Sequence, residues 1–107
     1  MKAEWDIHKA VENLLKHGVS FPEALEIFED PFALTVSDDE HSADEERYVT
    51  LGMCARLEIL LVVHTYRSPL PAVAGQRPDE VLRIISARNA TQTERNVYIK
   101  RRKGGLL

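Results

Sequence analysis

The sequence lacks several features that would place it in a specialised class of protein. It has one cysteine, Cys54, so no internal disulfide can form, and no Cys/His spacing of a zinc site repeats along the chain. The longest uninterrupted apolar run, residues 59–63, is too short to span a bilayer, and the first residues, MKAEWDIHK, have no apolar signal core. These absences predict a cytoplasmic protein of a reducing compartment with no membrane segment.

Length and charge point to one globular domain with an uneven surface. The chain has 107 residues, of which 44% are hydrophobic, which is enough for one core without staples, so we expect a single domain, 1–107. The net charge of −3 divides into −9 for residues 1–50, 0 for residues 51–82 and +6 for residues 83–107. This asymmetry favours a local anion site over a uniformly basic surface, although a solvated basic helix face would also explain it.

Two apolar patterns near the N-terminus predict helices. The first pattern follows Asp6, a capping residue, and ends at Gly18, which suits the left-handed position after a helix. The second pattern runs from the capping box SFPE at residues 20–23 to Asp30-Pro31. The first helix has one apolar stripe, made of Ile7, Ala10, Val11, Leu14 and Leu15.

From residue 32 the apolar period changes from 3.6 to 2, which predicts strands. We expect strands at residues 3–5, 32–36, 47–53, 57–66 and 81–87, with residues 57–66 central because both faces of that strand are largely apolar. The acidic residues 37–46 and the proline-rich residues 67–79 are loops, and the capping box TQTE at residues 91–94 opens a helix to about residue 102.

The order of these elements, β-α-α-β-β-β-β-α, predicts an α+β fold. Successive strands with short connections imply a small, mainly antiparallel sheet. We expect the two N-terminal helices on one face of this sheet, followed by a C-terminal helix.

Residues 83–88, RIISAR, raise the question of which anion the sheet meets. Arg83 and Arg88 frame a short apolar strand, and each guanidinium must reach water or an anion because it stays charged. Their spacing sends them to opposite faces of a straight strand. They can therefore share a site only if Arg88 lies past the strand end, next to Asn89.

Three further groups are candidates for an anion site, and each has a plainer explanation. Lys16 and His17 end the first predicted helix, where cations stabilise the helix C-terminus. Glu46 and Arg47 end a loop, where a surface ion pair is common. The basic residues 100–103 are typical of a solvated tail.

The remaining polar residues indicate neither a metal nor a cofactor. The four histidines, at positions 8, 17, 41 and 64, form no i, i+4 pair of a helical metal site, and the acidic stretch DDEH at residues 38–41 is a weak cation site. His64 shares a strand face with Leu60 and Val62, as a hydrogen-bonded core histidine does. Cys54 and Ser86 have no local nucleophile signature, and there is no Gly-rich phosphate loop.

Several segments in this order carry a resemblance to a known family: Trp5-Asp6, Asn13, KHGVSF at residues 16–21, FEDP at residues 28–31, Glu46-Arg47, Gly52, the apolar strand ending near His64, RIISAR at residues 83–88, Glu94-Arg95 and Tyr98. The chain resembles the BrnT family, the toxins of type II toxin–antitoxin pairs, over almost its whole length. The segments KHGVSF and RIISAR are the most specific. The loop at residues 67–79 departs from the family because it is longer and richer in proline.

The resemblance implies a RelE-like fold and a ribonuclease that slows translation. It also implies a cognate ribbon-helix-helix antitoxin, encoded downstream, that blocks the toxin. Toxin and antitoxin would bind operator DNA together, with the DNA contacts made by the antitoxin.

A metal-free ribonuclease of this kind needs cations for the phosphate and one or two groups that transfer protons. Under this hypothesis Arg83 and Arg88 clamp the phosphate, and Lys16, with His17, supplies a second cation. Glu46 is the candidate base, with Arg47 beside it to position the carboxylate or the substrate. The substrate-binding residues would be His17, Arg95, Lys100 and Arg101.

The alternative is a catalytically inactive binding protein that serves only as antitoxin partner or co-repressor. The acidic pI of about 5.8 favours this alternative, because RNA affinity rests on phosphate neutralisation. The basic C-terminal quarter favours the ribonuclease.

Overall fold

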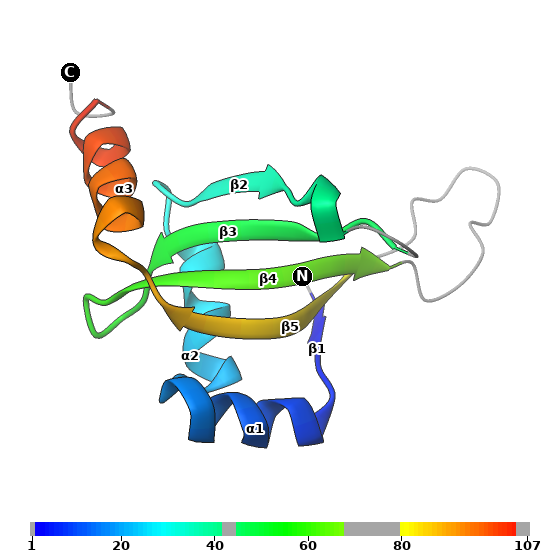
Figure 1. Cartoon of the computed structure of the whole chain (residues 1–107). Coiled ribbons are helices and arrows are strands. Elements are labelled where there is room, and N and C mark those ends of the chain that lie inside the picture. Colours follow the sequence, from blue (N-terminus) through cyan, green and yellow to red (C-terminus); the bar gives the residue numbers. More distant parts are fainter. Residues whose placement is uncertain (1, 42–44, 68–79, 105–107) are drawn as a thin grey trace, which may run out of the picture.

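The computed structural model describes residues 2–41, 45–67 and 80–104, which form one five-stranded sheet in the order β1-β5-β4-β3-β2 (Figure 1). The strands are β1 (Lys2–Glu4), β2 (Leu34–Ser37), β3 (Tyr48–Met53), β4 (Ile59–Arg67) and β5 (Val81–Asn89). The helices are α1 (Ile7–His17), α2 (Phe21–Glu26) and α3 (Gln92–Gly104), with two 3-10 turns, η1 (Ile27–Glu29) and η2 (Asp39–His41). Most of the predicted proline-rich loop, residues 68–79, lies outside the described residues.

The sheet is mixed, and the predicted α+β class is confirmed. Pairing is antiparallel from β2 through β5, whereas the short β1 joins β5 in parallel. The strand predicted to be central is β4, which has two strands on each side. The strand expected from residue 32 begins at Leu34, because the Asp30 carboxylate accepts the Phe32 backbone N–H at 2.9 Å and holds that residue in a turn.

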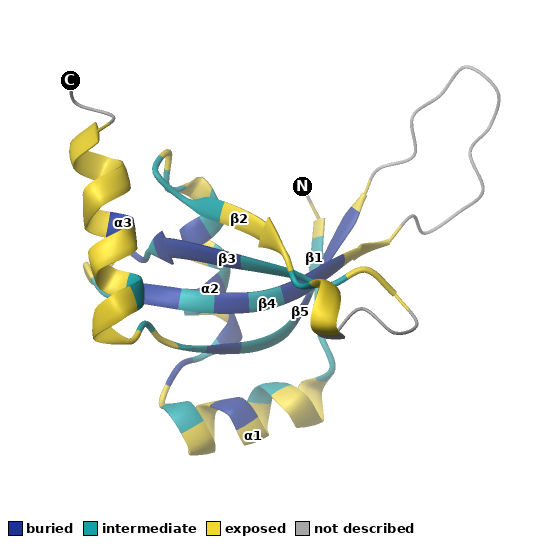
Figure 2. Cartoon of the chain, turned by 45° about the horizontal axis from the view of Figure 1, so that its top comes forward, coloured by how far each residue is buried: buried dark blue, intermediate teal, exposed yellow. Residues whose placement is uncertain are grey.

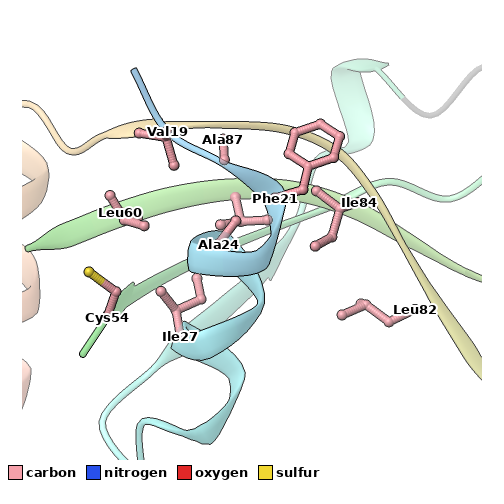
Figure 3. Close-up of a cluster of buried hydrophobic side chains, with 10 residues drawn as sticks. Val19, Phe21, Ala24, Ile27, Cys54, Leu60, Leu82, Ile84 and Ala87 are labelled. Carbon is pink, nitrogen blue, oxygen red and sulfur yellow. The ribbon is translucent and has the colours of Figure 1, made fainter. Parts of the chain in front are cut away.

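One face of the sheet, the core face, is covered by α2 and η1 (Figure 3). Gly52 of β3 lies beneath η1, and a Cβ on this glycine would stand 2.9 Å from the Cβ of Ile27, so the close packing of η1 requires glycine here. The main core cluster consists of Val19, Phe21, Ala24, Ile27, Cys54, Leu60, Val62, Leu82, Ile84 and Ala87.

The helix α1 packs against β5, and the side of the helix that faces the strand is the polar side that carries Asn13. Asp6 caps it by accepting the His8 N–H at 2.8 Å, and Gly18 ends it with a φ of 70°. Ala10 of the predicted apolar stripe packs against the core, whereas Leu15 is 83% exposed and Asn13 is the buried residue of the helix. The reason is a set of hydrogen bonds between the Asn13 side chain and the chain beside it, described below.

The helix α3 packs against the opposite face of the sheet, the open face. Tyr98 is fully buried there in a second cluster with Leu51 and Ile59, and its hydroxyl donates to Asp30 at 2.6 Å. The predicted capping box is present, since the Thr91 hydroxyl accepts the Glu94 N–H at 3.2 Å. Most of the α3 surface is exposed (Figure 2), and no helix within the described ranges is long and apolar enough to cross a membrane.

Candidate active site

A β-bulge in β5 decides which side chains reach the open face. Antiparallel pairing between β4 and β5 joins Val63 to Ser86 but His64 to Ile84, so Ile85 is an extra residue in β5. An extra residue reverses the alternation of side chains along the strand. Leu82 and Ile84 lie before the bulge and Ala87 lies after it, yet all three belong to the core cluster.

The same bulge places Arg83 and Arg88 on one face. Their partners on β4 are Thr65 and Leu61, which are four residues apart and therefore on the same side of that strand. The expectation from the sequence was that the two arginines share a face only if Arg88 lies beyond the strand. Arg88 instead lies within β5, which extends to Asn89, and the bulge supplies the change of parity.

Four residues form a row across the open face at Arg83. The strand register pairs Arg83 with Thr65 on one side and with Glu4 of β1 on the other. Tyr48 pairs with His64, and the Arg47 carbonyl accepts the Asp38 N–H from the β2 side at 2.8 Å, so we infer, by extending the β3–β4 register one residue beyond Tyr48, that Arg47 lies opposite Thr65. Two strand spacings then separate the backbones of Arg47 and Arg83, which is about 10 Å.

The carboxylate of Glu4 joins this row to a third arginine that the sequence did not single out. Arg67 holds Glu4 through both of its carboxylate oxygens, one of them at 2.6 Å from Nη2. Hydrogen bonding to Arg67, together with the charges of Arg67 and Arg83, lowers the pKa of Glu4. Glu4 and Arg67 are 63 residues apart, so no local sequence pattern could have revealed the pair.

Thr65, in the middle of the row, is 1% exposed, and its hydroxyl has no hydrogen-bond partner among the described residues. An unpaired buried hydroxyl costs free energy and usually has an explanation in function or in bound water.

Glu46 lies on a different side of the sheet from Arg47. Its carboxylate accepts the Tyr48 hydroxyl at 2.8 Å, and the Tyr48 ring stacks on His64 with centroids 5.9 Å apart. His64 belongs to the core face, where its ring also meets the edge of Phe28. The negative charge of Glu46 raises the pKa of Tyr48 through this hydrogen bond.

His64 is a core residue, as its position on the apolar face predicted. Its ring is 0% exposed, and its Nε2 atom is 2.7 Å from the Thr50 hydroxyl, which in turn lies 2.7 Å from the Thr35 hydroxyl. The Nδ1 atom has no partner within the described part of the chain. Burial lowers the pKa of His64 to about 4, so the ring is neutral at physiological pH.

Lys16 and His17 line a groove of about 240 Å³ between α1 and the bulge. The Asn13 amide fixes α1 at this edge by donating to the Ala87 carbonyl at 2.8 Å and accepting the Ala87 N–H at 3.0 Å, as a paired strand would. A further bond from its Nδ2 reaches the Val19 carbonyl at 2.9 Å. The groove is lined by Lys9, Glu12, Asn13, Lys16, His17, Ile85 and Ser86.

Arg88 is already bound to a carboxylate. Its two terminal nitrogens donate to Glu94 at 2.7 and 3.0 Å, a planar two-point contact that also ties β5 to the first turn of α3. Glu94 accepts the Thr91 N–H at 2.8 Å as well, and these hydrogen bonds, led by those from Arg88, lower the pKa of Glu94 to about 2. The same hydrogen bonds to Glu94 raise the pKa of Arg88.

The predicted substrate-binding cations of α3 differ in their surroundings. Arg101 donates to the Phe32 carbonyl at 3.1 Å and so anchors α3 to the segment before β2. Arg95 and Lys100 are exposed. Arg102, which the prediction did not include, lies 5.3 Å above the Phe32 ring.

No group of three or more His, Cys, Asp or Glu side chains in the described ranges is arranged to hold a metal ion. Of the weak cation site at residues 38–41, the structure places Asp39, Glu40 and His41 in the turn η2.

Comparison with known proteins gives this geometry a context. The sequence profile of the family described as "Ribonuclease toxin, BrnT, of type II toxin-antitoxin system" matches residues 5–94. Among curated protein sequences, none matches significantly. The crystal structure of the Brucella abortus ribonuclease toxin BrnT is similar, with a TM-score of 0.59 and 30% identity, and the match covers 86% of this chain and 99% of that one. The chain therefore belongs to the BrnT family of ribonuclease toxins of type II toxin–antitoxin systems.

Proposed function

We propose that this chain is a cytoplasmic endoribonuclease that cleaves RNA without a metal ion and so inhibits translation, and that a ribbon-helix-helix antitoxin neutralises it. The observation that carries the proposal is the row of Arg47, Thr65, Arg83 and Glu4 on the open face, with Arg67 beside it. A RelE-like classification of the fold is part of the same proposal.

The chemistry rests on charge stabilisation. In metal-free cleavage the RNA 2′-hydroxyl gives its proton to a base, its oxygen attacks the neighbouring phosphorus, the bond from phosphorus to the 5′-oxygen breaks, and the 5′-oxygen takes up a proton from water. Negative charge builds on the phosphate oxygens during this step, and cations held in place by a protein scaffold stabilise it without having to reorganise. Arg83 is such a cation, because its strand is fixed on both sides by Thr65 and Glu4.

Arg83 and Arg88 serve different phosphates of one RNA strand in this proposal. Their partners on β4 are four residues apart, which is about 14 Å along a strand. Arg88 is also drawn toward α3 by Glu94. The groove with Lys16 and His17 lies beside the bulge between the two arginines, so the bound strand would run along β5.

Two carboxylates with different surroundings are the candidates for the base. Glu46 is exposed and is bonded only to Tyr48 among the hydrogen bonds described here, so it can act as the base once it turns toward Arg47. Glu4 lies within the row, but its hydrogen bonds to Arg67 stabilise the charged form and make it a weak base. We therefore assign the role of base to Glu46. Glu4 instead holds Arg67 and Arg83 in position.

Partner binding completes the proposal. A type II family implies an antitoxin and an RNA target. We propose that operator DNA is bound only through the antitoxin, and that Arg95, Lys100 and Arg101 contact RNA from α3.

The rival function is that of an inactive homologue that only binds antitoxin. It is favoured by the way several cations are engaged inside the protein, with Arg88 on Glu94, Arg67 on Glu4 and Arg101 on a backbone carbonyl. Purified chain incubated with RNA and a chelator separates the two. Cleavage that persists in chelator supports the metal-free nuclease, whereas cleavage that needs a restored divalent ion contradicts it, and absence of cleavage in both favours the binding protein.

A further inference from the structure

Thr65 of β4 carries a buried hydroxyl for which the fold supplies no partner. Its side chain lies on the open face, since it alternates with the core residues Leu60, Val62 and His64 of the same strand. Thr65 is 1% exposed, and its Oγ1 atom makes no hydrogen bond within residues 2–41, 45–67 and 80–104. Leaving such a group unpaired costs free energy, and a ligand that pairs with it removes this cost.

The groups around Thr65 are hydrogen-bond donors that cannot accept. Arg83 is its partner on β5, and Arg67 lies two residues farther along the same face of β4. The register inferred above places Arg47 opposite Thr65 on the other side. A guanidinium group has N–H donors and no acceptor, so none of these three can take the hydroxyl proton of Thr65. The missing partner is therefore an acceptor.

The carboxylate of the row does not supply that acceptor. Glu4 belongs to β1, two strands away from Thr65, and Arg67 holds both of its oxygens. Three guanidinium groups and one carboxylate leave an excess of positive charge around the unpaired hydroxyl. A phosphate diester matches both features, because it is an anion whose oxygens accept hydrogen bonds from hydroxyl and guanidinium groups together.

We propose that the Thr65 hydroxyl donates a hydrogen bond to a non-bridging oxygen of the RNA phosphate that Arg83 contacts, an inference that rests on the proposed function. The side chains beside Thr65 are long and partly exposed, Arg67 to 48% and Glu4 to 32%, so they can turn to admit a phosphate oxygen. The threonine side chain is short and stiff. It would therefore fix how close the phosphate lies to the sheet, which a flexible arginine cannot do.

Binding of a single-stranded RNA that is 2′-O-methylated throughout, and so cannot be cleaved, tests the proposal by fluorescence anisotropy. The variant Thr65→Val keeps the shape of the side chain and removes the hydroxyl. We expect it to bind this RNA about tenfold more weakly, because a hydrogen bond to a charged group is lost. Its melting temperature should be equal to or higher than that of the wild type, because an unpaired polar atom is replaced by a methyl group. Thr65→Ser retains the hydroxyl and should restore most of the affinity.

The matched control is Thr50→Val on the core face. Thr50 is also 1% exposed, but its hydroxyl lies 2.7 Å from the Nε2 atom of His64 and 2.7 Å from the Thr35 hydroxyl. The same substitution should therefore lower the melting temperature by roughly 5 °C and leave the RNA affinity unchanged. The two valine variants are thus expected to have opposite effects on stability and on binding.

Wild-type affinity of Thr65→Val for the methylated RNA would overturn the proposal. A melting temperature of Thr65→Val as low as that of Thr50→Val would also overturn it, because the hydroxyl would then have a partner, such as a bound water, in the free protein. Affinity is measured without cleavage. A wild-type chain that binds the methylated RNA but leaves ordinary RNA intact would therefore overturn the proposed nuclease alone.

Discussion

The two faces of the sheet carry different kinds of side chain and tolerate charge differently. On the core face the buried polar groups of the strands are neutral, as in the hydrogen-bonded series of Thr35, Thr50 and His64. On the open face the polar groups are charged and mostly partly exposed, as Arg83, Arg88 and Glu4 are. Substitutions on the core face should therefore change stability, whereas those on the open face should change activity.

Titration of His64 is expected to give the largest effect, and on stability alone. The pKa of His64 is about 4 in the folded protein and near its ordinary 6.5 when unfolded, so the unfolded chain binds the proton first as the pH falls. Stability is fully present above pH 6.5 and should decrease by about 3 kcal/mol as the pH falls toward 4. Urea unfolding at several pH values measures this loss.

The variant His64→Leu is the control for that titration, because Thr50 keeps its contact with Thr35. Its stability should vary less between pH 6.5 and pH 4 than that of the wild type. Equal slopes for both proteins would show that other groups cause the pH dependence.

Arg83→Ala should give the next largest effect, on activity alone. Cleavage of RNA should fall by about 10²-fold or more because a preorganised cation is lost, and unfolding should shift by less than ~0.5 kcal/mol. Arg56→Ala is a matched control, since Arg56 is exposed and pairs with Glu23 and Glu58 away from the open face. A loss of stability that accounts for the lost activity would make Arg83 a structural residue.

Arg88→Ala is expected to affect both properties, because this arginine also joins β5 to α3. Its contact with Glu94 is partly exposed, so the stability cost should be no more than about 1 kcal/mol. Cleavage should fall about tenfold, less than for Arg83. The double-mutant cycle with Glu94→Ala measures the coupling, and a coupling energy of zero would show that the pair does not stabilise the fold.

The variants Glu46→Gln and Glu4→Gln test which of the two carboxylates is the base and which positions the arginines. Loss of a base should lower kcat by roughly 10²-fold and leave RNA binding unchanged. Loss of Glu4 should instead weaken RNA binding and leave the shape of the pH profile unchanged. The opposite pattern would assign the base to Glu4.

The smallest effect concerns the acidic side of the molecule. Reversing the charge of Asp38, Asp39 and Glu40 to lysine should slow association with a basic antitoxin segment a few-fold at low salt and leave RNA cleavage unchanged. Stopped-flow association over a salt series measures it. Wild-type rates throughout would make these residues a solubilising surface.

Local patterns were sufficient for the order and type of the helices and strands. The capping residues Asp6, Ser20 and Thr91, and the apolar period of β4, each depend on neighbours within a few residues. The orientation of α1 was not predictable in this way. An apolar stripe states which side of a helix is hydrophobic, and only the bonds of Asn13 to a strand 74 residues away decide which side is buried.

The residues of the candidate site also differ in whether local sequence patterns could reveal them. Arg83 and Arg88 stood out in the sequence as cations framing a strand, and Lys16 and His17 as cations at a helix end, and the structure places all four along β5. Glu4 and Arg67 were missed because their pairing depends on a parallel contact between the first and last strands. The separation of Glu46 from Arg47 follows from strand alternation once Tyr48 is known to face the core.

Ile85, the bulge residue of β5, shifts the alternation of side chains along this strand by one position. Before Ile85 the even-numbered residues face the core, and after it the odd-numbered ones do, as Leu82, Ile84 and Ala87 show. If β5 were straightened with Ile85 kept in the ladder, Arg88 would turn toward the core and Ala87 would turn outward, whereas removal of Ile85 would leave both arginines on the open face without a bulge. The number of residues between Arg83 and Arg88 therefore determines whether this strand needs a bulge to present both cations on one face.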